Sequence, residues 1–265
     1  MWKAFVLTIS NLIEKPFSNG IVIDERYKII AHLGSGSYGH SYLVFDSIRQ
    51  EKVVLKTLRW HKRLTQNGRN GFFKEILFLK EINSPFFPKL YDSGTVKSTP
   101  YFIMEFIQGK NFEQLIFEEG IVFDERESFV LGNELLEIIA FLQEISIVHR
   151  DIRIPNIMWD GKQIKVIDLG LAEKVNINQT EKKEKSRHPR KQIDYKSDYY
   201  GLGHFLLFLL YSGYTPPENG QEKSWEEELS LSPEAKMVIK KLLQSAPPYD
   251  TIEQIQLDLK KMIDS

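Results

Sequence analysis

Two carboxylates and one amide in the middle of the chain form the pattern with the clearest chemical meaning. Asp151 and Asn156 lie five residues apart, and Asp168 follows twelve residues after the amide. Phosphoryl transfer needs one carboxylate to orient the attacking hydroxyl and accept its proton, and oxygen ligands to hold divalent cations beside the phosphates. The spacing therefore predicts Asp151 as the base, and Asn156 and Asp168 as ligands of Mg²⁺, with Mn²⁺ as an alternative ion.

The same stretch resembles the catalytic loop and the metal-binding triplet of the eukaryotic-type protein kinases in order and in gaps. The loop reads His149-Arg150-Asp151-Ile152-Arg153-Ile154-Pro155-Asn156, and the triplet reads Asp168-Leu169-Gly170. The resemblance implies an ATP- and Mg²⁺-dependent kinase that phosphorylates proteins, itself included. The short chain fits a compact bacterial member of that family.

The residue two positions after the base indicates the kind of hydroxyl that is phosphorylated. Kinases acting on Ser or Thr usually carry Lys there, and Arg153 keeps its charge but changes its geometry. Tyrosine kinases usually carry Arg four positions after the base, where this chain has Pro155. The resemblance therefore favours Ser/Thr, with Arg153 among the catalytic residues. We interpret His149 as a core histidine and not as an acid or base.

A glycine-rich segment near the N-terminus is a candidate phosphate-binding loop. Its spacing, G-x-G-x-x-G, is made by Gly34, Ser35, Gly36, Ser37, Tyr38 and Gly39. Glycines let backbone N–H groups lie close to phosphate oxygens. Dinucleotide-binding folds use the same spacing but continue into a helix, whereas residues typical of a strand follow here, as in the kinase loop. Ser41 stands where that family usually has Val.

A lysine and a glutamate complete the predicted nucleotide site. Lys56 ends an apolar strand-like run and resembles the kinase lysine that contacts the phosphates, and Glu75 resembles the helix glutamate that aims it. Glu81 is the competing partner. The resemblance also places Met104, Glu105 and Ile107 in the connector that binds adenine.

The elements that must position these residues follow from the hydrophobic periodicity. The pattern predicts strands at 27–33, 41–45, 53–55, 89–95 and 101–105, and a helix over 72–80. After residue 109 it predicts helices, including one from the capping box of Asp124 and Glu127, a buried one over 199–210, one starting at Ser232, and a last one over 251–262.

The fold class predicted is α+β, the two-lobed protein-kinase-like fold. The N-lobe, a small antiparallel sheet with one helix, covers residues 21–104, the hinge covers 105–109, and the mainly helical C-lobe covers 110–265. Residues 1–20 form an amphipathic extension in which Trp2, Phe5, Val6, Ile9, Ile13 and Phe17 recur at helical spacing. Packing of this helix on the domain is the favoured interpretation, and an interfacial membrane helix is the alternative.

The chain departs from the family pattern between the metal-binding triplet and residue 198. The usual Ala-Pro-Glu triplet is absent, and Pro248-Tyr249 replaces the late Arg that pairs with its Glu. Because one partner buried without the other is destabilising, the joint loss predicts a remodelled substrate loop. Asp198 still resembles the start of the helix that anchors the catalytic loop.

The biased segment 182–191 carries Lys182, Lys183, Lys185, Arg187, Arg190 and Lys191. A solvated loop is the default interpretation, and recruitment of an acidic substrate or a regulatory nucleic acid is the sharper hypothesis. Thr180 and Ser186 are candidate phosphorylation sites, because an added phosphate could order the loop through nearby arginines.

Composition excludes several other classes. The 265 residues carry a net charge of −1 and no cysteine, which removes disulfides, thiolate metal sites and a thiol nucleophile. No apolar run is long enough to span a bilayer, and we predict a cytoplasmic protein. The alternatives to a protein kinase are a nucleotide-binding scaffold with little transfer activity and a kinase-like enzyme acting on a small molecule.

Overall fold

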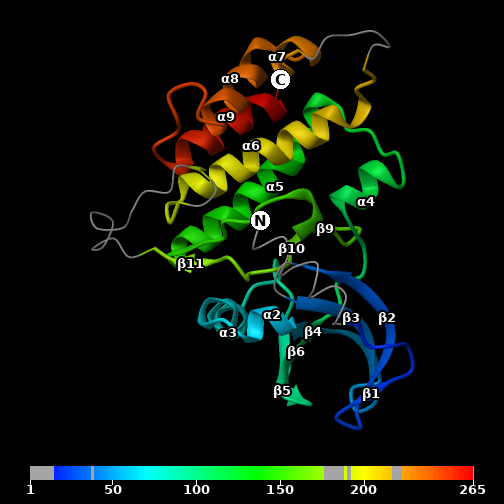
Figure 1. Ribbon diagram of the computed structural model, residues 1–265. Coiled ribbons are helices and arrows are strands. Elements are labelled where there is room, and N and C mark those ends of the chain that lie inside the picture. The colour runs from blue at the N-terminus through cyan, green and yellow to red at the C-terminus, as the bar shows by residue number, and fades with distance from the viewer. Residues whose placement is uncertain (1–14, 37–38, 176–187, 190–191, 217–222, 265) are drawn as a thin grey trace. The chain divides into compact units, whose positions relative to one another are not determined.

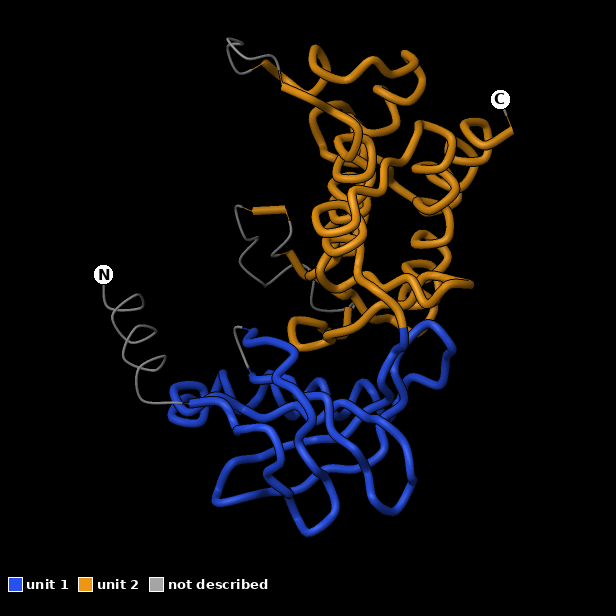
Figure 2. Tube along the Cα trace, turned by 90° about the vertical axis from the view of Figure 1, so that its right-hand side faces the viewer, with its two compact units in different colours: residues 1–108 blue, residues 109–265 orange. Residues whose placement is uncertain are grey.

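The computed structural model describes residues 15–36, 39–175, 188–189, 192–216 and 223–264. The chain divides into two compact units, residues 1–108 and residues 109–265, which Figure 2 colours separately. No helix in the described ranges is both long enough and apolar enough to cross a membrane. Of the predicted extension 1–20, residues 1–14 lie outside the described residues.

Unit 1 is built on one antiparallel sheet of six strands in the order β1-β2-β3-β4-β6-β5. The strands are β1 (Val22–Ile23), β2 (Tyr27–Ser35), β3 (Gly39–Asp46), β4 (Glu51–Leu58), β5 (Leu90–Val96) and β6 (Thr99–Glu105). The turn between β5 and β6 places Lys97 and Ser98 at φ 45° and 63°. Two left-handed residues match the tight turn that follows the twist of antiparallel strands.

A helix covers one face of this sheet, and a buried cluster forms on the other. Helix α3 (Gln66–Glu81) packs Phe72 on Phe102, with ring centroids 5.2 Å apart. The opposite face gathers Tyr27, Tyr42 and Tyr101, among other residues, into a buried core. The single helix expected here has a short neighbour, α2 (Trp60–Arg63), which the periodicity does not reveal because one turn gives no period.

Unit 2 is mainly helical, as Figure 1 shows. Its helices are α4 (Phe112–Phe117), α5 (Glu125–Glu144), α6 (Lys196–Leu210), α7 (Trp225–Glu228), α8 (Pro233–Leu242) and α9 (Ile252–Asp264). The predicted capping box begins α5, since Asp124 and Glu127 each accept the other's backbone N–H. Ser232 caps α8, as expected from Ser-Pro-Glu.

Short strands in unit 2 lie before α4 and between α5 and α6. They are β7 (Lys110–Asn111), β8 (Ile147–Val148), β9 (Ile157–Trp159), β10 (Ile164–Val166) and β11 (Glu173–Lys174). They form one sheet in the order β10-β9-β7 and a second pairing of β11 with β8. The sequence pattern does not predict these strands, because two or three residues are too few to show alternation.

Candidate active site

The segment 149–156 is held in shape by one buried carboxylate. Asp198, in the first turn of α6, accepts hydrogen bonds from the backbone N–H groups of His149 and Arg150, each at 2.7 Å. Arg150 has φ 64°, a left-handed conformation that few non-glycine residues adopt. The two hydrogen bonds to Asp198 compensate for the strain of this turn. They are the contacts through which Asp198 could anchor the loop, as expected from the sequence.

The helix approaches this segment closely enough to require a glycine. A Cβ on Gly201 would lie 2.6 Å from Cβ of Ile152. Ile152 is itself buried, as are Leu202 and Phe205 on the same helix. Gly201 is therefore a positioning residue, and it is not among the residues predicted from the sequence. Its only signal is a glycine inside an otherwise apolar helix, where glycine costs about 1 kcal/mol relative to alanine.

Burial and hydrogen bonding shift the pKa of Asp198 in opposite directions. Burial, the larger effect, raises its pKa to about 7, while the two N–H groups and the charge of Arg150 act to lower the pKa. The neighbouring His149 is fully buried, and burial lowers its pKa to about 4. Its Nδ1 accepts the backbone N–H of Asp151 at 3.2 Å. His149 is therefore a neutral core residue at pH 7, as interpreted from the sequence.

The predicted base is oriented by residues on both sides of its carboxylate. Asn156 donates from Nδ2 to Oδ2 of Asp151 at 2.9 Å and to the Asp151 carbonyl at 3.0 Å. Nε of Arg153 lies 3.2 Å from Oδ1. The side chain of Asp151 is 19% exposed and that of Arg153 is 50% exposed. The carboxylate is thus fixed but accessible.

The second predicted metal ligand is brought beside the first by a short hairpin. Asn156 precedes β9, Asp168 follows β10, and these strands pair with Ile157 opposite Val166. The backbone N–H of Ile167 also donates to the Asn156 carbonyl at 2.9 Å. Asp168 has φ 72° and accepts the N–H of Gly170 at 3.0 Å, a local turn stabilised by its own side chain.

The donor atoms at this point suit a hard cation. Since the amide nitrogen of Asn156 is committed to Asp151, its oxygen is the atom left to coordinate, together with the carboxylate of Asp168. Within the described ranges, no group of three or more His, Asp or Glu residues could hold a metal. Few protein ligands, supplemented by water and phosphate oxygens, are the usual arrangement for Mg²⁺.

Unit 1 contains the predicted lysine–glutamate pair. Nζ of Lys56 lies 2.7 Å from Oε1 of Glu75, and their side chains are only 7% and 1% exposed. The competing Glu81 lies at the exposed end of α3. A buried charge pair at this distance fixes the ammonium in one position.

The glycine-rich segment lies between β2 and β3. Gly34 and Ser35 end β2, Gly39 begins β3, and the N–H of Gly36 donates to the Gly39 carbonyl at 2.9 Å. A Cβ on Gly39 would lie 2.4 Å from the carbonyl oxygen of Thr57, so close approach to β4 requires glycine here. Ser37 and Tyr38 lie outside the described residues.

The predicted connector continues from β6. Met104 and Ile107 are buried at 6% and 5% exposure. The backbone N–H of Glu105 donates to the carbonyl of Lys89 at 2.8 Å. The candidate phosphorylation sites Thr180 and Ser186 lie outside the described residues, as does most of the basic segment 182–191.

Tyr249 stands near the place of the late Arg of the kinase family and makes contacts of a different kind. Tyr249 is buried at 3% exposure, and its hydroxyl donates to Asp258 of α9 at 2.9 Å. Nearby, Nζ of Lys196, at the start of α6, lies 2.8 Å from Asp250. Because Asp250 is 78% exposed, this ion pair is screened by water and contributes little.

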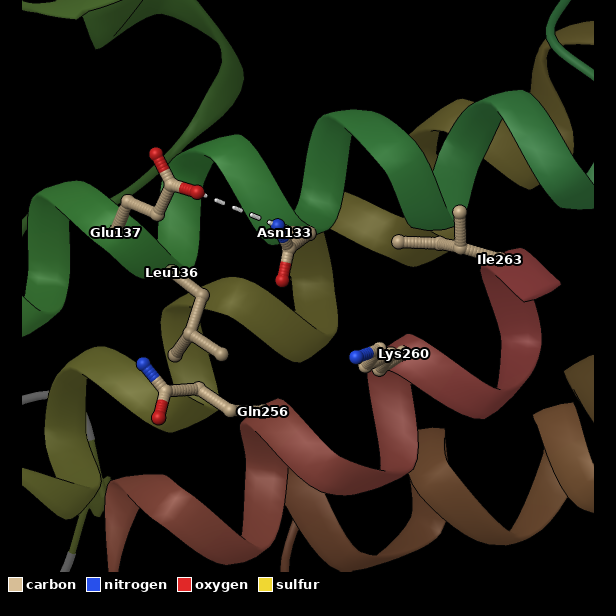
Figure 3. A pocket seen from close by; sticks show the side chains of 6 residues that line it. All are labelled: Asn133, Leu136, Glu137, Gln256, Lys260 and Ile263. Carbon is tan, nitrogen blue, oxygen red and sulfur yellow. Dashed lines mark hydrogen bonds between the residues drawn. The ribbon is translucent and has the colours of Figure 1, made fainter.

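A groove on the surface of unit 2 is a possible ligand site by shape alone. Figure 3 shows its walls: Asn133, Leu136 and Glu137 from α5, and Gln256, Lys260 and Ile263 from α9. Its volume is about 340 Å³. None of these side chains belongs to the set around Asp151, and Asn133 donates to Glu137 through a long 3.5 Å hydrogen bond. The groove therefore holds none of the residues predicted to carry the chemistry.

Comparison with known proteins agrees with this geometry. Residues 27–264 match the protein kinase domain model. The chain belongs to the protein kinase family. It is thus a phosphotransferase, with the α+β kinase fold expected from the sequence.

Two curated bacterial relatives and one solved structure illustrate the similarity. The chain is 37% identical over 257 residues to the probable serine/threonine-protein kinase YbdM of Bacillus subtilis, covering 96% of each. It is 27% identical to the serine/threonine-protein kinase PrkC of the same organism, over 92% of this chain and 41% of that one. The PknI kinase domain of Mycobacterium tuberculosis matches with a TM-score of 0.71 and 16% identity, over 94% of this chain and 99% of that one. That last match supports the fold alone.

Proposed function

We propose that this protein kinase transfers the γ-phosphoryl group of ATP to Ser or Thr hydroxyls of proteins, including its own chain, with Mg²⁺ as the cofactor. One observation carries the proposal: the carboxylate of Asp151 is accessible yet oriented by Asn156 and Arg153. A chain that only bound nucleotide would have no use for a fixed, accessible base.

In this mechanism Asp151 accepts a hydrogen bond from the substrate hydroxyl and takes its proton as the oxygen attacks phosphorus. Arg153 lies beside the same carboxylate and can stabilise negative charge on the transferred group. Asn156 and Asp168 would hold the metal ion, which when bound neutralises phosphate charge.

The residues of unit 1 are assigned to the nucleotide. Lys56, fixed by Glu75 at 2.7 Å, contacts the phosphates as a point charge. The segment Gly34–Gly39 supplies backbone N–H groups to the same phosphates. The adenine is assigned to the connector formed by Met104, Glu105 and Ile107.

The preference for Ser and Thr rests on Arg153 and on the two bacterial relatives, both named serine/threonine-protein kinases. A cytoplasmic location, phosphorylation of Thr180 or Ser186, and recruitment of a nucleic acid by segment 182–191 stay predictions. Intact-mass measurement after incubation with Mg-ATP tests the two phosphorylation sites, since no added phosphate on either would exclude them.

The test is transfer of labelled phosphate from ATP to a generic protein substrate, with Mg²⁺ or Mn²⁺, beside Asp151→Asn. Loss of a base lowers the rate by ~10²–10⁴-fold, while nucleotide binding is retained. Binding without transfer in the unmutated chain would instead support a scaffold, and transfer only to a metabolite would support a small-molecule kinase. The altered contacts of Tyr249 and Asp258 make the scaffold the stronger of these two alternatives.

A further inference from the structure

Two histidines and a serine meet on the hairpin that carries the glycine-rich segment. Oγ of Ser35 lies 2.7 Å from Nδ1 of His40 and 3.3 Å from Nε2 of His32. The two imidazole rings have centroids 5.6 Å apart. Two ring nitrogens that converge on one point are arranged like the ligands of a metal ion. Neither histidine has a role in the chemistry proposed above.

The strand pairing explains why these side chains share one face of the sheet. His32 lies opposite Tyr42, and Ser35 lies opposite His40. Residues directly opposite each other project to the same face, as do residues two apart on one strand. The pairing register shifts between His32 and Gly34, and such an irregularity re-aims the side chains that follow it. In a regular strand, residues 32 and 35 would lie on opposite faces.

The face that carries the histidines is not the face that carries Lys56. Ser41 of β3 lies opposite Lys56 of β4, and successive residues of a strand alternate between the two faces. His40 and Tyr42, on either side of Ser41, therefore project away from Lys56. A ligand bound by the histidines would be separate from the phosphates assigned to that lysine.

The histidines pack on a rigid surface. Tyr42 is 1% exposed and belongs to the buried core of unit 1. Its ring centroid lies 5.2 Å from that of His32 and 6.2 Å from that of His40. His40 is 4% exposed, whereas His32 and Ser35 are exposed. One imidazole is thus held in place by packing, and the other side of the site is open to water.

The donor atoms indicate which ion would bind. Neutral imidazole is a preferred ligand of Zn²⁺, which is usually bound by four atoms in a tetrahedron. Burial and the nearby charge of His40 lower the pKa of His32, so its ring is neutral at pH 7. The hydroxyl of Ser35 has one proton and can donate it to only one of the two nitrogens. An ion between the nitrogens would bind both of them at once.

We propose that His32 and His40 bind one Zn²⁺ ion across the stem of the glycine-rich hairpin, with the hydroxyl of Ser35 and water as the remaining ligands. The ion joins β2 to β3 on both sides of the segment Gly34–Gly39 and clips the two strands together. This binding does not depend on phosphoryl transfer.

Calorimetric titration of the full chain with zinc chloride, in the absence of ATP, tests the site. Mg²⁺ is kept in excess so that the carboxylate of Asp168 does not contribute. We expect one Zn²⁺ ion per chain. We expect His32→Gln to weaken binding by at least about tenfold, the smallest loss typical even of residues that only support a metal ligand. His32 is exposed, so this substitution is expected to leave the fold intact.

His204→Gln is the matched control. His188 and His204 also lie near each other, and each packs edge-on against the ring of Tyr200. The control is expected to bind Zn²⁺ as the natural chain does. Equal affinity in the natural chain and in His32→Gln would overturn the site, as would the absence of binding or its loss in His204→Gln.

The buried His40 is tested without replacing it. In NMR spectra of the natural chain, Zn²⁺ is expected to shift the imidazole signals of His32 and His40 together. A shift of the His32 signal alone would overturn a site made of two histidines.

Amide hydrogen exchange tests the clip. The N–H of Gly36 donates to the Gly39 carbonyl at 2.9 Å, and its exchange reports local opening of the hairpin. Zn²⁺ is expected to slow this exchange several-fold in the natural chain and to leave it unchanged in His32→Gln. Equal exchange with and without saturating Zn²⁺ would show that the ion does not hold the strands together. A chain that binds Zn²⁺ in this way but transfers no phosphate would refute the proposed function alone.

Discussion

At the residue scale, two buried titratable groups lie side by side with pKa values shifted in opposite directions. The pKa of His149 is lowered to about 4 and that of Asp198 is raised to about 7. Unfolded His titrates near 6.5, so the unfolded state binds the proton more strongly than the folded state does. The contribution of His149 to the unfolding free energy is therefore fully present above pH 6.5 and decreases as the pH falls toward 4. The raised pKa of Asp198 has the opposite effect: its contribution to the unfolding free energy falls as the pH rises from about 4 to 7.

We therefore expect His149→Gln to make the unfolding free energy depend less on pH between pH 7 and pH 5. Between pH 7 and pH 5, the natural chain loses about 2 kcal/mol of unfolding free energy through His149, and the variant does not. Urea unfolding of both chains at the two pH values measures the difference, and the contribution of Asp198 cancels because both chains retain it. A difference that does not change with pH would show that the pKa of His149 is the same in the folded and unfolded chains.

The ion pair of Lys56 and Glu75 gives a second prediction at this scale. Glu75→Gln removes the charge that aims a buried ammonium, and we expect phosphoryl transfer to fall by about 10²-fold. Glu81→Gln, six residues along the same helix but at its exposed end, is the control and is expected to retain activity. Steady-state kinetics of the two variants distinguishes them, and equal activities would remove Glu75 from the proposed mechanism.

At the element scale, the start of α6 supports the predicted catalytic loop, whereas the start of α5 makes a different set of contacts. Asp198 and Gly201 join α6 to segment 149–156 through two hydrogen bonds and a close packing contact. The start of α5 is stabilised by its own capping box and by Glu125, which accepts hydrogen bonds from Ser232 before α8. Stability and activity are thus expected to respond differently to changes at the two helix starts.

Two substitutions of similar size test that separation. Asp124→Ala is expected to lower the unfolding free energy by about 1 kcal/mol and leave kcat unchanged. Asp198→Asn replaces one acceptor oxygen with an amide donor, so we expect a loss of about 1–3 kcal/mol together with loss of phosphoryl transfer. Thermal unfolding and kinetics of both variants are the measurements. Normal activity in Asp198→Asn would mean that the loop holds its shape without the carboxylate.

The elements also show which parts of the structure can be predicted from the sequence. Strands β2 to β6 and helices α3, α5, α6, α8 and α9 lie where the periodicity and caps predict them. Six short strands, β1 and β7 to β11, and helices α2, α4 and α7 are missed, because their conformation depends on pairing and packing with distant segments. The close placement of Asn156 and Asp168 depends on one such pairing, β9 with β10. The sequence predicts these site residues by resemblance, not by predicting that hairpin.

At the scale of the whole molecule, each unit has its own buried core, and the proposed ATP ligands are divided between units. Lys56 and Glu75 belong to residues 1–108, whereas Asp151, Asn156 and Asp168 belong to residues 109–265. A nucleotide bound by these residues is expected to stabilise the folded chain.

Thermal unfolding with a non-hydrolysable ATP analogue tests this expectation. At a ligand concentration of 100 times Kd, the stabilisation is about 2.7 kcal/mol, which is several degrees in Tm for a protein of this size. Removing Mg²⁺ with EDTA is expected to reverse most of the shift, and Asp168→Asn to lose the part that depends on Mg²⁺. A shift of equal size with and without Mg²⁺ would argue against a metal at Asn156 and Asp168.

The left-handed turn at Arg150 has a consequence for how the protein refolds. The carboxylate that accepts its backbone N–H comes from Asp198, 48 residues further along the chain, so this hydrogen bond forms only when α6 has docked. Local contacts form early in folding, whereas contacts between distant segments must first close a long loop. After dilution from urea, we therefore expect helical circular dichroism to return before enzyme turnover, with recovery of turnover limited by the arrival of α6.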